Sequence, residues 1–586
     1  MKFKLIRQVA AALACISFFM PIGGAAPQPT NNVEINVAGL QGDVLKNVTS
    51  RLEILKNNIY TAQMKTLKER YYQNILTQVQ DALTPFGYFK PKINIRIYNV
   101  NQYWMVKITV DPGPRLIFDK VTVNVTGEGS TDTAYAKALL HLPVKQGDYF
   151  NSEKYDQSKE ALQYVANVRG YFDAKFTTSK LVVDLRNYTS EVILEFETGK
   201  RYRFGDTIFS ASQIKQSLLQ RYLEYQPGDY YSSKLLEQSR LNLAGSNYFQ
   251  QVVMIPELRE ARDFKVPILT ELYPQDQVTY SLGAGYGTDT GVRALASMDL
   301  RWLNASGHSL KTLLRGSQNN SQLAASYMIP VHRPAYDSII ISGGAVRINQ
   351  TTGTGQNAQL SVGYQTLMYD WHFNAGITNL IEKYSLNNYP ITGVTTKTNA
   401  NVLYPQITLQ RMSSGKELLN PSQGYNIYFT AAGGSKSFGS KTDFTQTRLD
   451  AKFLYTFELT HTRLLARAAL GAISIANLSN LPLSMQFYAG GASSIRGFTY
   501  NSIGPGRYLA VGSFEIQQRI KGKIYLGGFI DAGNVNNRIT KSKVRIGAGP
   551  ALIYLSPIGA IELSIAKNAS PTDGHWRIQF SMGALL

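Results

Sequence analysis

Cysteine is almost absent from this chain. Its 586 residues include one cysteine, Cys15, which lies in an N-terminal segment with the pattern of a leader that is removed on export. The mature chain is therefore expected to contain no thiol. This excludes a disulfide-stapled fold, zinc sites built from cysteine and cysteine nucleophiles.

Long apolar runs are also absent once the N-terminal segment is set aside. No window approaches the roughly 18 uninterrupted apolar residues that a membrane-spanning helix needs. In a lipid bilayer every backbone polar group must find its partner within the protein, and without apolar helices only a closed barrel of strands achieves this. If the mature chain crosses a membrane, we expect it to cross as a β-barrel.

Motifs of catalysis and metal binding are missing too. The six histidines are scattered without the spacing of a metal site. The glycine-rich stretch 283–287 is not followed by a helix pattern, so it makes a poor phosphate-binding loop. Ser493 and Ser494 lack the local sequence of a nucleophile elbow. We therefore expect no enzyme activity, no metal site and no cofactor.

The N-terminus has the pattern of a secretory signal peptide: basic residues, then an apolar run, then small residues. Cleavage after Ala25 is favoured, since cleavage one residue later would place Pro27 beside the scissile bond. A lipoprotein signal at Cys15 is the alternative, but Ala12 stands where that signal has leucine. Residues 1–25 are thus predicted to be a signal peptide.

Positive charge is in excess, with a formal net charge of +20. One interpretation is that the charge keeps the protein soluble. The more specific interpretations are that it binds nucleic acid or an anionic membrane. Because an exported chain rarely meets nucleic acid, we expect an anionic lipid or a negatively charged partner and no nucleic acid.

The first half repeats itself about three times with a period of about 80 residues. Each repeat contains an aromatic turn, and these turns are Gly87-Tyr88-Phe89, Gly170-Tyr171-Phe172 and Asn247-Tyr248-Phe249. Inside each unit the periodicity predicts a strand, two helices and two further strands. The units are predicted at residues 32–114, 115–200 and 201–274.

This pattern resembles POTRA domains, the periplasmic modules that precede certain outer-membrane barrels. Three unrelated small α+β domains are the alternative. We expect helices to cover one sheet face while one sheet edge stays free, and a free edge can accept an incoming strand by β-augmentation. The resemblance therefore implies the handling of unfolded chains in the periplasm.

The second half, residues 276–586, loses the helical period and shows about sixteen stretches in which apolar and polar residues alternate. In the first stretch Tyr280 and Leu282 share one face, as Trp576 and Ile578 do in the last. Such a repeat, apolar toward lipid and polar toward a lumen, predicts an antiparallel transmembrane β-barrel. A soluble β-sandwich shares the alternation but would not normally need so many strands.

One stretch breaks this pattern: Ile495-Arg496-Gly497-Phe498 lies in a segment rich in glycine and serine. The order of signal peptide, POTRA-like units and barrel resembles the superfamily of outer-membrane insertases and translocators that includes BamA, FhaC and TamA. In that family an Ile/Val-Arg-Gly-Phe/Tyr motif lies on an extracellular loop folded back into the barrel lumen. The resemblance implies an outer-membrane location, with the POTRA-like units in the periplasm.

The family also places acidic residues on neighbouring strands, matched here by Glu515 and Asp531. Alternation independently predicts that both carboxylates face the lumen, since their immediate neighbours are apolar. A buried arginine without a counter-ion would be costly, and a planar guanidinium can satisfy two carboxylates, which a lysine cannot. We therefore expect Arg496 to bind Asp531, Glu515 or both; a solvated loop arginine is the alternative.

The resemblance further implies a lateral gate between the first and last strands. Gly283, Gly285 and Gly287 give the first strand few side chains to pair across the seam, and interior glycine weakens a strand. The chain as given ends without the terminal aromatic residue common in outer-membrane barrels. Recognition of the last strand is therefore expected to rest on Phe580.

Three POTRA-like units, rather than two or five, resemble the TamA branch of the superfamily. This implies a TamB-like inner-membrane protein that contacts the first unit, and unfolded outer-membrane clients such as autotransporters. A basic outer rim would pair with lipopolysaccharide, although a merely solvated rim is equally compatible. The alternative functions are a passive porin-type channel, a two-partner secretion transporter, and a surface enzyme or adhesin.

Overall fold

The computed structural model describes residues 33–57, 68–100, 103–387, 396–414, 420–538, 543–557, 559–569 and 574–583. The predicted signal peptide, residues 1–25, lies outside these ranges. Among the helices of the described ranges, none is long and apolar enough to cross a membrane. The chain divides into two compact units, Met1–Tyr202 with Tyr230–Ser233, and Arg203–Asp229 with Lys234–Leu586.

Two α+β modules make up the described part of the first unit. The first contains β1 (Val33–Ala38), α1 (Gly42–Asn57), α2 (Lys68–Leu83), β2 (Lys92–Val100) and β3 (Tyr103–Asp111), and the second contains β4 (Ile117–Thr126), α3 (Thr133–Leu140), α4 (Ser152–Arg169), β5 (Lys175–Asp184) and β6 (Thr189–Glu197). The last strand of each module lies in the middle of its sheet, in the orders β1-β3-β2 and β4-β6-β5. It pairs in parallel with the opening strand and antiparallel with the other. Strands β2 and β5 are therefore sheet edges.

The core of the second module follows from the alternation along β6. Val192, Leu194 and Phe196 are each 0% exposed, and they share one face because side chains two residues apart in a strand point the same way. Leu162 and Ala166, one turn apart on α4, lie in the same buried cluster as Phe196. The helix thus covers one face of the sheet, as the periodicity predicts.

The repeat places an arginine after each of the first two modules, in the pattern acid-x-Gly-x-Arg. Arg115 donates from Nε to the carbonyl of Phe86 at 2.8 Å, and Arg201 donates from Nε to the carbonyl of Arg169 at 2.9 Å. Each accepting residue immediately precedes the glycine of a Gly-Tyr-Phe turn. The guanidinium therefore ties the linker back to the aromatic turn, which accounts for the recurrence of both motifs in the sequence.

A third α+β module lies mainly in the second unit. It contains β7 (Arg203–Phe209), α5 (Gln216–Leu219), α6 (Ser233–Gly245), β8 (Phe249–Pro256) and β9 (Lys265–Pro274), with the sheet order β7-β9-β8. Its core, which includes Leu243 and Tyr248, packs against Trp302. Tyr248 donates from Oη to the carbonyl of Gly307 at 2.6 Å. A Cβ at Gly307, where φ is +74°, would lie 2.5 Å from that hydroxyl oxygen, so the contact requires glycine.

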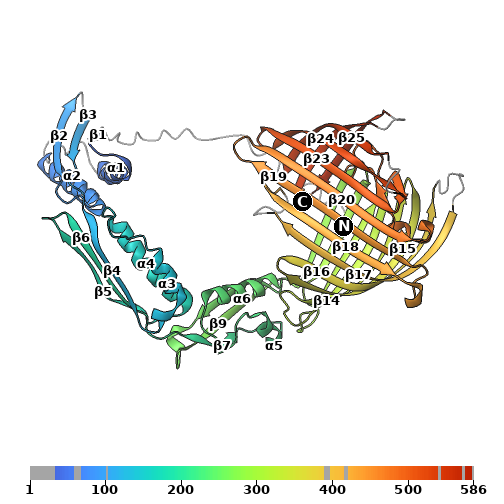
Figure 1. The fold of residues 1–586 in the computed structure, drawn as a ribbon, viewed down its shortest axis with the longest axis horizontal. Coiled ribbons are helices and arrows are strands. Elements are labelled where there is room, and N and C mark those ends of the chain that lie inside the picture. Colours follow the sequence, from blue (N-terminus) through green and yellow to red (C-terminus); the bar gives the residue numbers. More distant parts are fainter. Residues whose placement is uncertain are drawn as a thin grey trace, which may run out of the picture. The chain divides into compact units, whose positions relative to one another are not determined.

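Sixteen strands form one antiparallel sheet in the second unit (Figure 1). They are β10 (Val278–Gly287), β11 (Gly291–Leu300), β12 (Ser309–Ser317), β13 (Asn320–Pro330), β14 (Ser338–Gln350), β15 (Gly353–Met368), β16 (Trp371–Leu386), β17 (Thr396–Ser413), β18 (Gly424–Gly434), β19 (Phe444–Phe457), β20 (Thr462–Ile475), β23 (Tyr508–Lys521), β24 (Ile524–Asn536), β25 (Arg545–Ser556), β26 (Gly559–Asn568) and β27 (Trp576–Gly583). The sheet curls until residues beside β10 contact β27. The predicted architecture of α+β modules followed by an antiparallel barrel is confirmed.

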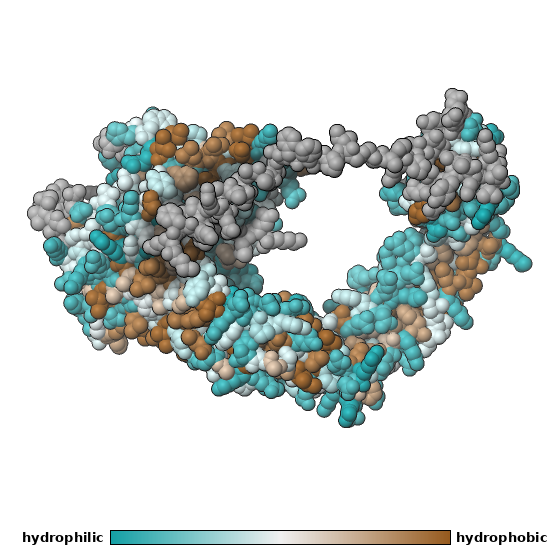
Figure 2. Space-filling model, turned by 180° about the vertical axis from the view of Figure 1, so that it is seen from behind, coloured by the Kyte–Doolittle hydropathy of each residue, from teal (hydrophilic) through white to brown (hydrophobic). Residues whose placement is uncertain are grey.

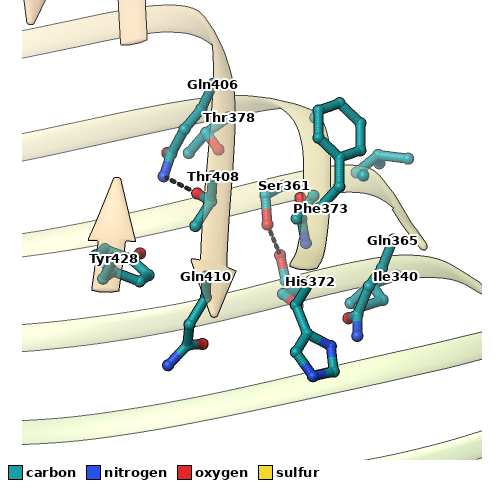
Figure 3. Close-up of a pocket in the computed structure, with 15 residues that line it drawn as sticks. Ile340, Ser361, Gln365, His372, Phe373, Thr378, Gln406, Thr408, Gln410 and Tyr428 are labelled. Atoms are coloured by element: carbon teal, nitrogen blue, oxygen red, sulfur yellow. Dashed lines mark hydrogen bonds between the residues drawn. The ribbon is translucent and has the colours of Figure 1, made fainter. Parts of the chain in front are cut away.

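Side chains alternate between the two faces of the barrel wall. Leu282, Ile377 and Ile516 are among the apolar residues exposed on the outer face, and Figure 2 shows apolar residues gathered over the strands. The inner face is polar: a cavity of about 420 Å³ along β14–β18 is lined by residues such as Thr408 and Gln410 (Figure 3). Apolar outside and polar inside is the pattern of a wall that meets lipid outside and a lumen inside.

Asp132 fixes the start of α3 in the second module. Its carboxylate accepts from the N–H of Ala134 at 2.9 Å, which caps α3, and from Nε of Arg169 at 3.0 Å. Burial alone would raise the pKa of this carboxyl, but the hydrogen bonds from Ala134 and Arg169 hold the pKa below its usual value. The stabilisation is therefore complete above the unfolded-state pKa of about 4, and it is lost as the pH falls through the lower folded-state pKa.

The substitution Asp132→Ala should lower the local stability of the second module by about 2 kcal/mol at neutral pH, because it removes a helix cap and a buried partner of Arg169. Hydrogen–deuterium exchange of the whole protein measures this as faster exchange in α3 and α4. The control is Asp43→Ala, which removes a solvent-exposed ion pair with Lys46 in α1 and should change exchange little. Equal exchange in the two variants would contradict the role of Asp132.

Candidate functional site

The loop between β20 and β23, residues 476–507, packs against the inner face of the barrel and is called the lumen loop below. It contains a small hairpin of β21 (Phe487–Ala489) and β22 (Ile503–Gly506). The motif residues Ile495 and Phe498 lie in a buried apolar cluster with Leu509 and Val511 of β23. Residues of odd number on β23 face inward, whereas Phe514 is exposed on the outer face. The lumen loop therefore fills part of the interior.

Arg496 is 1% exposed and forms a two-point ion pair with Asp531 of β24. Its Nε lies 2.8 Å from Oδ2 of Asp531, and its Nη2 lies 2.9 Å from Oδ1. The main-chain N–H of Arg496 also donates to Oδ2 of Asp531 at 2.9 Å. Two parallel hydrogen bonds fix the plane of the guanidinium, and the third fixes the loop backbone beside it.

Two glutamates bind the remaining side of the guanidinium. Nη1 of Arg496 donates to Glu515 of β23 and, at 2.9 Å, to Oε1 of Glu562 of β26. The ring of Phe529 covers the guanidinium face, with its centroid 3.5 Å from Cζ of Arg496. One loop arginine thus binds side chains of three barrel strands.

A second arginine joins the cluster from β20. Nη2 of Arg467 lies 3.6 Å from Oδ1 of Asp531, and it donates to Oγ of Ser513 at 3.0 Å. Ser513 and Asp531 are direct cross-strand partners of β23 and β24. Two guanidinium groups therefore face three carboxylates, which balances most of the charge that the fold buries here.

Glycine permits the close approach of the lumen loop to the wall. A Cβ at Gly547 of β25 would lie 1.8 Å from the carbonyl oxygen of Arg496, which no larger residue could accommodate. Gly497 has φ of +91°, a left-handed conformation, and its N–H donates to Oε1 of Gln579 of β27 at 2.9 Å. The glycine of the motif thus joins the loop to the last strand.

Three of the four predicted gate residues lie where the two ends of the sheet meet. A Cβ at Gly287 would lie 3.7 Å from the carbonyl oxygen of Phe580, and a Cβ at Gly285 would lie 3.0 Å from Nε of Arg293. The ring of Phe580 lies 6.2 Å from the ring of Tyr286. Gly283 has only the Cβ of a β11 residue near it. The structure brings Gly285, Gly287 and Phe580 to the seam, while Gly283 lies farther along β10.

Several residues of the site were missed by the sequence argument. Glu562 carries the same signal as Glu515, an acid between apolar neighbours on a strand, so alternation could have found it. Glu382 of β16 is 0% exposed and accepts from the N–H and Oγ of Ser484, which anchors the other end of the lumen loop. No local pattern pairs residues 382 and 484. In the described part of the chain, no cluster of His, Cys, Asp or Glu could hold a metal ion.

The substitution Arg496→Lys should destabilise the folded barrel by about 3–5 kcal/mol, because one ammonium cannot satisfy three buried carboxylates. The measurement is the urea midpoint at which the folded form is lost on electrophoresis without heating. The control is Arg411→Ala, whose ion pair with the exposed Asp370 should contribute less than about 1 kcal/mol.

A charge reversal tests direct pairing. If Arg496→Glu combined with Asp531→Arg recovers none of the stability lost in the single variants, Arg496 and Asp531 do not pair directly.

Family models match both halves of the chain. Residues 306–584 match the Omp85 superfamily domain, and residues 34–112 match a model described as POTRA domain, TamA domain 1. Residues 121–198 and 202–273 match the POTRA family, described as a surface antigen variable number repeat.

Relatives and solved structures point the same way. Outer membrane protein assembly factor BamA of Neisseria meningitidis is 21% identical over 91% of this chain and 75% of its own length. BamA of Buchnera aphidicola is 24% identical, over 30% of this chain and 29% of its own. The crystal structure of Haemophilus ducreyi BamA lacking POTRA domains 1–3 has a TM-score of 0.67 at 17% identity, covering 80% of this chain and 99% of that one.

The sixteen-stranded wall, the modules before it and these matches locate the protein in the outer membrane, with its POTRA modules in the periplasm. The chain carries an Omp85 superfamily domain at residues 306–584 behind POTRA-type modules, and these matches support the superfamily that includes BamA and TamA.

Proposed function

We propose that this protein assembles or exports client proteins at the outer membrane by opening the seam between β10 and β27. The observation that carries the proposal is the weakness of that seam. Strand β10 pairs with β11 along all of its residues, from Val278 to Gly287. Across the seam, by contrast, the described residues share one main-chain hydrogen bond, from the N–H of Thr288 to the carbonyl of Phe580 at 3.3 Å.

A weak seam provides a physical route for insertion. When β10 and β27 separate, each exposes unpaired main-chain groups that can template an incoming strand. A client strand gains hydrogen bonds there while its apolar face moves into lipid, so the process needs neither ATP nor a catalytic group. Edge strands β2 and β5 of the periplasmic modules offer further sites for β-augmentation by unfolded clients.

The lumen loop argues against the alternative of a passive porin. It occupies the interior and is anchored to opposite parts of the wall, by Glu382 on β16 and by Asp531 on β24. A two-partner secretion transporter is the other alternative. Two POTRA modules would indicate that function, whereas this chain has three, which favours assembly.

Locking the seam should abolish assembly. The mature chain is predicted to lack cysteine, so Thr288→Cys with Phe580→Cys creates a disulfide that closes the seam under oxidising conditions. Cells that depend on this variant should lose folded outer-membrane clients to the level of cells depleted of the protein, and reduction should restore them. The matched control is Ala296→Cys with Leu314→Cys, which links the directly paired strands β11 and β12 away from the seam. Normal levels of folded outer-membrane clients in cells depleted of this protein would contradict the proposed function.

We further propose that the protein acts in the manner of TamA, with a TamB-like inner-membrane partner at its first module. The match of residues 34–112 to the TamA-type first POTRA domain supports this. Affinity purification from membranes should recover such a partner with the whole protein and lose it when residues 32–114 are deleted. Recovery in equal amount without that module would place the contact elsewhere. Autotransporters as clients and lipopolysaccharide at the outer rim are part of the same proposal.

A further inference from the structure

Asp289 lies in the turn between β10 and β11 and binds the lumen loop. Its Oδ2 accepts from the N–H of Ala492 at 2.6 Å. The preceding residue, Gly491, has φ of +104°, and a Cβ there would lie 2.7 Å from the same carboxylate oxygen. The loop backbone is thus fitted onto the carboxylate, on the first-strand side of the seam.

The same loop binds the last strand a few residues later. Gln579 of β27 accepts from the N–H of Gly497 at 2.9 Å and donates to the carbonyl of Phe498 at 3.4 Å. Gln579 is 1% exposed, so water does not compete for these bonds. Residues 491–498 of the loop therefore span the seam from inside, with one anchor on each side.

The segment between the anchors is short and folded as a turn, in which the N–H of Ser494 donates to the carbonyl of Gly491 at 3.1 Å. Gly497 follows Ala492 by five positions, which limits the span to roughly 17 Å even when fully extended. Arg496 within this segment is held by the buried carboxylates, and the carbonyl of Ala492 accepts from Arg467 at 3.5 Å. A displacement of either anchor must therefore open this turn or break one of these bonds.

Direct contacts across the seam are made beside the Asp289 anchor. Oγ1 of Thr288 accepts from the N–H of Phe580 at 3.2 Å. Arg293 of β11 reaches past Gly285 and donates to the carbonyl of Met582 at 3.0 Å, through space that a side chain at residue 285 would fill. The hairpin that carries Asp289 therefore also supplies the side chains that hold β27.

We infer that the lumen loop is an internal staple of the lateral gate, anchored by Asp289 on the hairpin of the first strand and by Gln579 on the last strand. Opening of the seam then requires release of one anchor, and movement of the loop is transmitted to the seam. The biological role of the staple rests on the proposed function, whereas the staple itself is a property of the barrel.

Spin labels at Val292→Cys and Ile578→Cys test the staple in the whole mature protein in lipid nanodiscs. Both side chains face outward, at 65% and 64% exposed, and lie on either side of the seam. Pulsed electron paramagnetic resonance should show a wider distance whose population rises roughly tenfold in Asp289→Ala, as the loss of one charge-assisted hydrogen bond predicts. Gln579→Ala should act in the same direction. Asp289→Asn should change the population less, because its amide oxygen can still accept from Ala492.

Two further variants make the result decisive. The matched control Asp299→Ala, at the other end of β11, should leave the distances unchanged. Arg496→Ala should widen the seam in the native background but add little once Asp289 is alanine, because the transmitting anchor is already lost. The folded electrophoretic form of each variant is verified first.

Unchanged distances in Asp289→Ala and Gln579→Ala would overturn the staple, as would an Arg496→Ala effect of equal size with and without Asp289. These distances do not depend on any client. Failure of the staple therefore leaves the proposed function standing, whereas normal clients in depleted cells would defeat the function and leave the staple intact.

Discussion

The guanidinium of Arg496, buried among three carboxylates, is the interaction on which the barrel interior depends. Charged groups lose most of their hydration when buried, so each must find a partner of opposite charge in good geometry. That requirement fixes the inward face of β23, β24 and β26, since a slip of one residue in any of them would turn its acid toward lipid. It also accounts for Gly547, which leaves room for the loop carbonyl.

Strong and weak contacts are divided between the interior and the seam. Inside, the lumen loop is held by ionic hydrogen bonds and by an apolar cluster that includes Ile495 and Phe498. At the seam, the hydrogen-bond ladder that joins all other neighbouring strands is replaced by contacts of Thr288 and Arg293 with β27. Such a division allows one boundary of the sheet to open while the rest of the wall keeps its register.

Much of this site could be predicted because its signals are local. Alternation along a strand predicts that Glu515 and Asp531 share the inner face, and a short motif identifies Arg496; the same reasoning extends to Glu562. The contact of Asp289 with Ala492 has no such signal. It joins a turn and a loop about two hundred residues apart, and it depends on the stagger of the strands between them. Periodicity likewise predicts helices and strands in the modules. The hydrogen bonds of Arg115 and Arg201 join residues about thirty positions apart, so no local pattern predicts them.

The third module is attached to the wall at several points near the first strand. Gly307 lies in the turn that joins β11 to β12, and Tyr248 donates a hydrogen bond to its carbonyl. Arg221 of the same module donates to the carbonyl of His332 in the turn between β13 and β14, and the module continues directly into β10 at Val278. A displacement of this module relative to the wall therefore acts on β10–β14, the strands on the first-strand side of the seam.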